Sequence, residues 1–123
     1  MFGRLGGSIL NVNWVLSAAH CMWEGEQMIV IAGEHDFSTN TGTEQTRLVA
    51  EFINHERYDD WELYNDIAVM RLATPLTLVS GIVEVTRLPP PGRIHTGQVT
   101  LFGWGGTSRT SVQVWPDILQ VRF

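Results

Sequence analysis

The sequence predicts an all-β fold built from short antiparallel strands. Short segments rich in β-branched and aromatic residues recur along the chain, separated by Gly, Pro, Asn and other turn formers. No window of about 11 residues keeps its apolar residues at helical spacing between suitable caps. With 123 residues and 44% hydrophobic composition, the chain suffices for one folded domain and is too short for two ordinary ones.

Seven strands are expected, each bounded by turn residues, at 7–10, 14–18, 28–32, 46–54, 67–72, 99–102 and 118–123. The longest, 46–54, alternates between two faces as a half-buried strand does. That alternation predicts one face made of Leu48, Ala50 and Phe52. It predicts an opposite face made of Arg47, Val49, Glu51 and Ile53.

A proline-rich run divides the chain. Pro89, Pro90 and Pro91 cannot donate hydrogen bonds to a β ladder, and Gly92 follows them, so this run predicts a connector. We therefore expect a first β unit over residues 1–88, a connector over 89–98 and the first strands of a second unit over 99–123. The polar runs 38–45 and 56–65 are expected loops.

Composition and charge exclude two classes of partner. Eight basic residues, all of them Arg, against 13 acidic residues give a net charge of −5, which argues against nucleic acid as a partner. No apolar run reaches the about 18 residues that would span a membrane. The first 20 or so residues superficially imitate a secretory signal. Asn11, Asn13 and the Gly6-Gly7 pair interrupt their apolar stretch, so no signal peptide is expected in this chain.

Two polar residues flank apolar strands and could carry chemistry. His20 closes the segment Trp-Val-Leu-Ser-Ala-Ala-His-Cys, so a rigid strand could aim its imidazole. Asp66 lies immediately before the alternating strand 67–72. Taken singly, each residue also has a structural interpretation: a strand-end histidine and an aspartate that starts a strand at a turn.

Together these segments resemble the chymotrypsin-like serine proteases. The resemblance extends, in the family's order, to Gly-Gly-Ser-Ile-Leu at 6–10, Val-Ile-Ala-Gly-Glu-His at 30–35, Pro-Leu at 75–76 and Phe-Gly-Trp-Gly at 102–105. It implies a trypsin-like fold of two antiparallel β-barrels, here the first barrel and the start of the second. It implies His20 as general base and Asp66 as the group that fixes the imidazole tautomer. It also implies protein or peptide substrates, secretion, no required cofactor and a likeness to the arthropod digestive branch.

The sequence departs from the family at the nucleophile. The family serine follows the aspartate by about 90 residues, and no Gly-Asp-Ser-Gly-Gly segment occurs. Ser8 and Ser17 lie in strand segments and do not replace it. The chain is therefore expected to be an inactive amino-terminal half, without oxyanion hole or specificity pocket. Two alternatives stay open: a non-catalytic homologue that acts as a binding module, and an incomplete gene model without independent function.

A second departure concerns the first barrel. The family's first strand is missing before Gly6, and Leu5 holds the place of the cysteine that pairs with the one after the catalytic histidine. Cys21 is thus expected to be an unpaired thiol, since it is the single cysteine of the chain. By itself a lone cysteine fits either a reducing compartment or a truncated extracellular chain. The resemblance favours the extracellular interpretation.

Further sites follow from the resemblance. The loop from Glu34 to Glu44 resembles the calcium loop of trypsins, with carboxylates at both ends. Thr41 stands where calcium-binding members have another Glu, so weakened calcium binding and a merely solvated acidic loop are both open. Trp61 and Leu63 are expected to line the substrate cleft.

His55 and His95 lack a second ligand at metal spacing and are expected to be exposed loop residues. The sequence indicates no protein partner and no particular oligomeric state.

Overall fold

The structure is a computed structural model that describes residues 5–105 and 120–122. Five strands form one sheet: β1 (Ser8–Asn11), β2 (Trp14–Ser17), β3 (Ile29–Ala32), β4 (Gln45–Asn54) and β5 (Ala68–Leu72). Their order is β1-β2-β5-β4-β3, and every neighbouring pair is antiparallel. Two shorter strands, β6 (Leu101–Gly103) and β7 (Gln120–Arg122), pair with each other.

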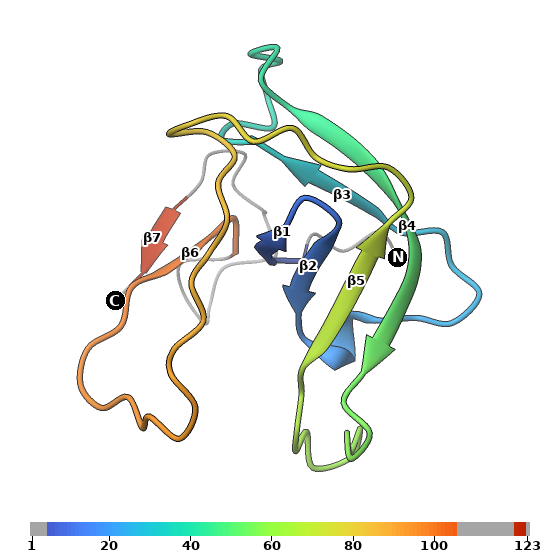
Figure 1. The fold of residues 1–123 in the computed structure, drawn as a ribbon, viewed down its shortest axis with the longest axis vertical. Helices are drawn as coiled ribbons and strands as arrows, with labels where there is room; N and C mark the ends of the chain where they lie inside the picture. Colours follow the sequence, from blue (N-terminus) through green and yellow to red (C-terminus); the bar gives the residue numbers. More distant parts are fainter. Residues whose placement is uncertain (1–4, 106–119, 123) are drawn as a thin grey trace.

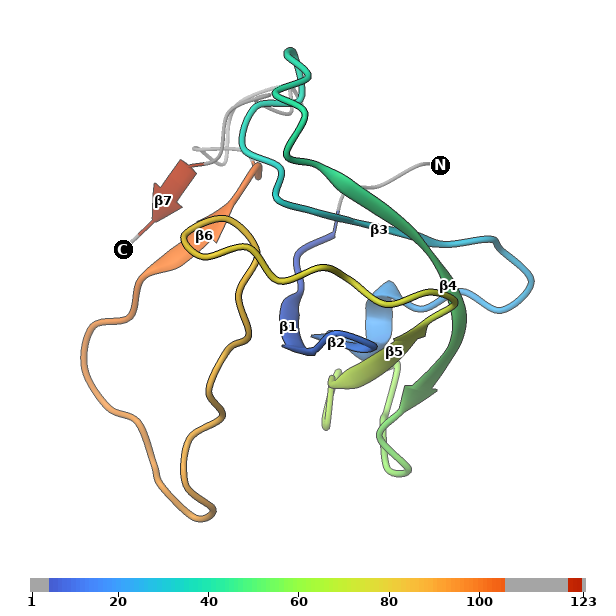
Figure 2. The ribbon, with the colours of Figure 1, turned by 45° about the horizontal axis from the view of Figure 1, so that its top comes forward.

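The five-stranded sheet curls into a half-barrel. β3 and the long β4 arch over the β1-β2 hairpin, and β5 lies between β2 and β4 (Figure 1). After a turn about the horizontal axis the same curvature is visible, with β6 and β7 beside the open side of the curl (Figure 2). The expected all-β class and the antiparallel, barrel-like sheet are confirmed. The division at residues 88 and 98 stays a prediction.

The core lies inside the curl and in the segment that follows β5. The buried cluster combines strand residues with two from that segment: Val15, Ala32, Met70, Leu72, Leu76 and Val83. Leu76 donates its amide to Val12 O at 2.8 Å, and Thr86 donates to Ile9 O at 2.7 Å. These bonds tie the segment to the β1-β2 hairpin. The core of the sheet is therefore formed by residues that precede the expected connector in the chain.

The long strand does not keep one alternation along its length. Val49 pairs with Leu72 and Glu51 with Arg71, so Ala50 is the extra residue of a β-bulge. The bulge shifts the phase, and Val49 and Phe52 both pack on the core while Leu48 and Ile53 are exposed. The predicted face of Leu48, Ala50 and Phe52 is therefore wrong, because one extra residue moves every later side chain to the other face.

The remaining elements lie close to their predicted positions. The strand expected at 99–102 is β6, shifted towards Gly103. Of the strand expected at 118–123 the described part is β7, and Ile118, Leu119 and Phe123 lie outside the described residues. A 3-10 turn, η1 (Ala19–Cys21), follows β2 and was not expected. Among the described residues no helix has the length and apolar character to cross a membrane.

Candidate active site

His20 and Asp66 meet because two strands end at the same place. β2 and β5 are antiparallel neighbours, and Ser17 pairs with Ala68 at the last rung. The chain leaves β2 into η1, which carries His20, and it enters β5 just after Asp66. Residues 46 apart in the sequence are thereby brought within hydrogen-bond distance.

The carboxylate of Asp66 holds His20 at two atoms. Oδ2 lies 2.7 Å from the imidazole Nδ1, and Oδ1 accepts the backbone N–H of His20 at 2.8 Å. This second bond fixes the backbone of the turn as well as the ring. The His20 amide, and then its ring, lower the pKa of Asp66, so the carboxylate stays ionised at neutral pH. An ionised acceptor requires the proton of the imidazole to be on Nδ1.

The other ring nitrogen faces a thiol. Cys21 Sγ lies 3.5 Å from His20 Nε2, and the cysteine is buried with 5% of its surface exposed. Burial raises the pKa of Cys21, so the group is a protonated thiol whose S–H can be donated to Nε2. Sequence reasoning missed this contact. Both residues belong to η1.

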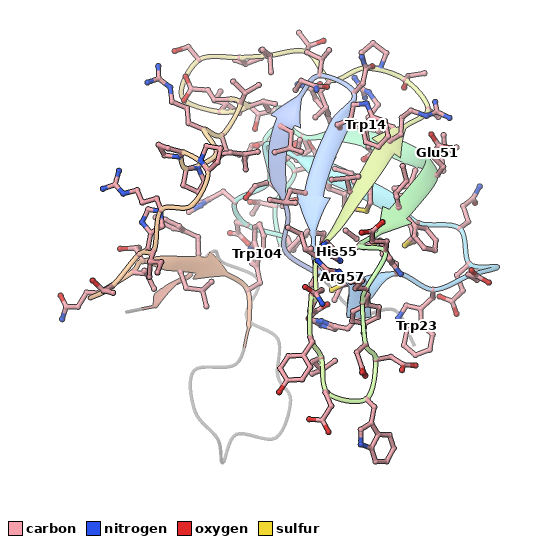
Figure 3. The ribbon with its side chains drawn as sticks, turned by 60° about the horizontal axis from the view of Figure 1, so that its bottom comes forward. Trp14, Trp23, Glu51, His55, Arg57 and Trp104 are labelled. Carbon is pink, nitrogen blue, oxygen red and sulfur yellow. The ribbon has the colours of Figure 1, made fainter. Side chains whose placement is uncertain are left out.

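A positioning residue lies beside the pair. Asn65 has a positive φ of 54°, a conformation that Asn tolerates better than most residues. Its side-chain amide donates to Arg57 O at 2.7 Å, which ties the start of β5 to the loop after β4. His55 and Arg57 mark the start of this loop at the lower end of β4 (Figure 3). An Asn directly before a candidate Asp is the signal that could have identified this role.

The two expected cleft residues lie on that loop, 55–66. Trp61 is 88% exposed and Leu63 is 54% exposed, with a φ of 56°. Both precede Asp66 closely in the chain, and their side chains are free to meet a ligand. Their role in substrate binding stays a prediction.

The other candidate residues lie elsewhere. Ser17 donates its hydroxyl to Gly6 O at 2.9 Å within the strand segment, as expected of a structural serine. His95 is exposed as predicted. His55 is half-buried, and its Nδ1 accepts the amide of Arg57 at 3.1 Å, so its prediction as an exposed residue is wrong. His55 directly follows β4 and donates its amide to Ile67 O at 2.9 Å, which holds it beside the start of β5 and explains its partial burial.

Glu34 and Glu44 stand at the two ends of the loop between β3 and β4. Each carboxylate accepts hydrogen bonds from the loop itself: Glu34 from the amide of His35 at 2.9 Å, Glu44 from the amide of Thr41 at 2.7 Å. The Thr41 hydroxyl adds a second bond to Glu44 at 2.8 Å. Within the described residues, no three His, Cys, Asp or Glu side chains converge as a metal site. Calcium binding by this loop stays a prediction.

The His20–Asp66 pair has the geometry of a proton acceptor held in one orientation. Asp66 fixes the tautomer and would stabilise a positive imidazole, and Nε2 is the atom left to take a proton. The His20 side chain is 52% exposed and that of Asp66 is 23% exposed, so the imidazole is open to solvent while its partner is sheltered. The arrangement suits general-base chemistry.

Comparison with known proteins agrees with this geometry. The family model described as Trypsin matches residues 4–122. Trypsin-1 of Astacus astacus is 38% identical over 97% of this chain and 51% of its own length. Brachyurin of Leptuca pugilator is 35% identical over 94% of this chain, and anionic trypsin of Bos taurus 36% over 94%.

The chain covers 51% and 45% of the length of these last two relatives, so it spans about half of the curated proteins it matches. The match nevertheless runs over almost the whole chain, including both strands that position His20 and Asp66. The chain belongs to the trypsin family.

Proposed function

We propose that this chain carries the histidine–aspartate half of a serine endopeptidase site, with His20 as general base and Asp66 as its orienting carboxylate. The observation that carries the proposal is the 2.7 Å contact between His20 Nδ1 and Asp66 Oδ2. The second bond, from the His20 amide to Oδ1 at 2.8 Å, supports it because it removes the freedom of the turn. The names of the relatives, which include trypsins and serine proteases, agree with this function.

In this proposal, Nε2 takes the proton of a serine hydroxyl as the hydroxyl oxygen attacks the carbonyl carbon of a peptide bond. The proton is later given to the departing amine. Asp66 stays ionised throughout and stabilises the imidazolium. The nucleophile and the donors that stabilise the oxyanion belong to no segment recognised in these 123 residues. We therefore propose that the chain alone does not hydrolyse peptides, and that the natural enzyme acts on proteins outside the cell.

Cys21 sets a condition on this chemistry. Its thiol lies where a donor to Nε2 would lie, so a serine hydroxyl must replace the S–H contact before it can lose its proton to His20. A thiol donates a weaker hydrogen bond than a hydroxyl.

Two assays test the proposal. The 123-residue chain, purified free of other proteases, should show no turnover of peptide substrates. Turnover that His20→Ala abolishes and His95→Ala leaves unchanged would contradict the inactivity of the chain. The natural protein, captured with an antibody against loop 55–66, should cleave peptides and lose that activity in the His20→Ala form. A natural protein without proteolysis would contradict the enzymatic role and leave a binding function.

A further inference from the structure

The loop between β3 and β4, at the top of Figure 1, is closed by its own hydrogen bonds. At its neck, the hydroxyls of Thr41 and Thr43 lie 2.7 Å apart, and Thr43 reaches Gly33 O at 3.3 Å. The Thr41 hydroxyl and amide both donate to Glu44 Oε1. A continuous chain of contacts therefore joins the residue after β3 to the residue before β4.

The oxygens inside the loop are also engaged by donors. Asp36 Oδ1 accepts the amide and the hydroxyl of Ser38 at 2.9 and 2.6 Å, and the carbonyl of Asp36 accepts the amide of Thr39 at 3.1 Å. Asn40 Oδ1 accepts the amide of Gly42 at 2.9 Å. The loop thus supplies its own N–H and O–H donors to several of its side-chain and backbone oxygens.

A calcium ion requires a different arrangement. It takes six to eight oxygens at about 2.3–2.6 Å, with their lone pairs directed at one centre. Glu44 Oε1 already accepts two hydrogen bonds, and the positive ends of these two donors would repel a cation approaching that oxygen. The amide and hydroxyl of Thr41 lower the pKa of Glu44 to about 2, so these two donors stabilise its ionised carboxylate.

A second anchor holds the loop from outside. The Trp104 indole N–H donates to His35 O at 3.1 Å, and the Trp104 ring packs on Phe37 with centroids 4.8 Å apart. Trp104 lies just after β6, on the side of the sheet where β6 and β7 pair (Figure 3). The loop is therefore fixed at its neck by threonines and at its middle by an aromatic residue.

We propose that Thr41 takes the place of a cation in this loop: its two donors satisfy Glu44, and the loop folds without calcium. Loss of one acidic ligand is thus coupled to gain of one hydroxyl donor, which adds to the backbone amide. The proposal concerns the loop alone and is independent of any catalytic role of His20 and Asp66.

Calcium titration by calorimetry tests the proposal directly. The wild-type chain should give no binding heat at millimolar calcium. Thr41→Glu removes the donor hydroxyl and adds the missing carboxylate, so it should create a site with a Kd of about 10⁻⁴–10⁻³ M, the range of weak extracellular calcium modules. Thr39→Glu is the matched control, because it adds the same charge to the same loop and leaves Thr41 in place.

Calcium binding by the wild-type chain would overturn the proposal. So would a Thr41→Glu chain that binds no calcium, or equal binding by Thr41→Glu and Thr39→Glu.

Thermal unfolding without calcium gives a second readout that does not depend on the Glu variant. Thr41→Ser keeps both donors and should keep the wild-type midpoint, whereas Thr41→Val keeps the amide alone and should unfold at lower temperature. Equal midpoints for Ser and Val would overturn the role of the hydroxyl.

Discussion

At the scale of single residues, the candidate site depends on which atom donates to which. Asp66 accepts one hydrogen bond from the ring of His20 and one from its backbone amide, so the same carboxylate fixes the tautomer and the turn. The sequence could predict that His20 and Asp66 act together, since both lie in recognisable segments. It could not predict the S–H contact of Cys21, because that contact depends on the side-chain conformations of two adjacent residues.

Acid titration should reveal the Thr41–Glu44 contact. The pKa of Glu44 is lowered from 4.5 to about 2. A carboxyl group whose pKa is lower in the folded state stabilises that state above its unfolded pKa, and this contribution is lost as pH falls towards the folded pKa. The midpoint difference between wild type and Thr41→Val should therefore be constant above about pH 5 and shrink towards about pH 2.

The measurement is thermal unfolding of both chains in a series of buffers of equal ionic strength. Because Glu44 lies near solvent, the effect should also shrink in high salt. A difference that stays constant down to about pH 2 would show that the ionised Glu44 carboxylate is not what Thr41 stabilises.

At the scale of elements, the positions of the strands in the sequence were predictable. Which side chains of the long strand β4 face the core was not. The turn residues around β1, β2 and β5 place those strands to within about one residue. The bulge at Ala50 leaves no signal in the sequence, because apolar residues occupy both faces of 46–54. The phase is set by packing: the bulge lets Val49 and Phe52 both reach the core.

Gly33 and Gly25 have similar positive φ angles but different surroundings, so alanine variants at the two positions distinguish backbone strain from steric crowding. Gly33 has a φ of 77°, and an added Cβ would lie 2.5 Å from Thr43 O. Gly25 has a φ of 82°, and an added Cβ would meet nothing within 4 Å. Both alanine variants should lose about 1–2 kcal/mol to the left-handed conformation. Gly33→Ala should lose more, because it also pushes the neck of the loop apart.

Chemical denaturation of the two variants checks this order. Gly25→Ala reports the conformational penalty alone and serves as the control for Gly33→Ala. Equal losses of unfolding free energy in the two variants would mean that the close approach of Gly33 to Thr43 is not maintained in solution.

At the scale of the whole molecule, the described sheet has two open edges. β1 and β3 each pair with one strand alone. The outer side of β1 also accepts the Thr86 amide at Ile9 O, whereas β3 carries exposed Ile29 and Ile31. Exposed edges with apolar side chains promote pairing between chains. The antiparallel fold itself was predictable, because short strands and ordered motifs run along the whole chain.

We expect the isolated chain to associate as its concentration rises into the range of about 10–100 µM. Ile31→Lys places a charge on the β3 edge and should reduce association. Val85→Lys is a control that changes an exposed apolar residue away from that edge. Sedimentation velocity measures the mass distribution of all three chains. A monomer across this range, or equal effects of the two substitutions, would contradict edge pairing.

In the candidate site, Asp66 holds His20 with its proton on Nδ1 and leaves Nε2 to accept one. The most direct measurement is ¹⁵N NMR of the histidine rings in the 123-residue chain at about pH 8, where an ordinary imidazole is neutral. The other three histidines are assigned by substitution. We expect a His20 ring protonated at Nδ1 in the wild-type chain, and a loss of that preference in Asp66→Asn. A His20 ring protonated at Nε2, or one unchanged by Asp66→Asn, would contradict it.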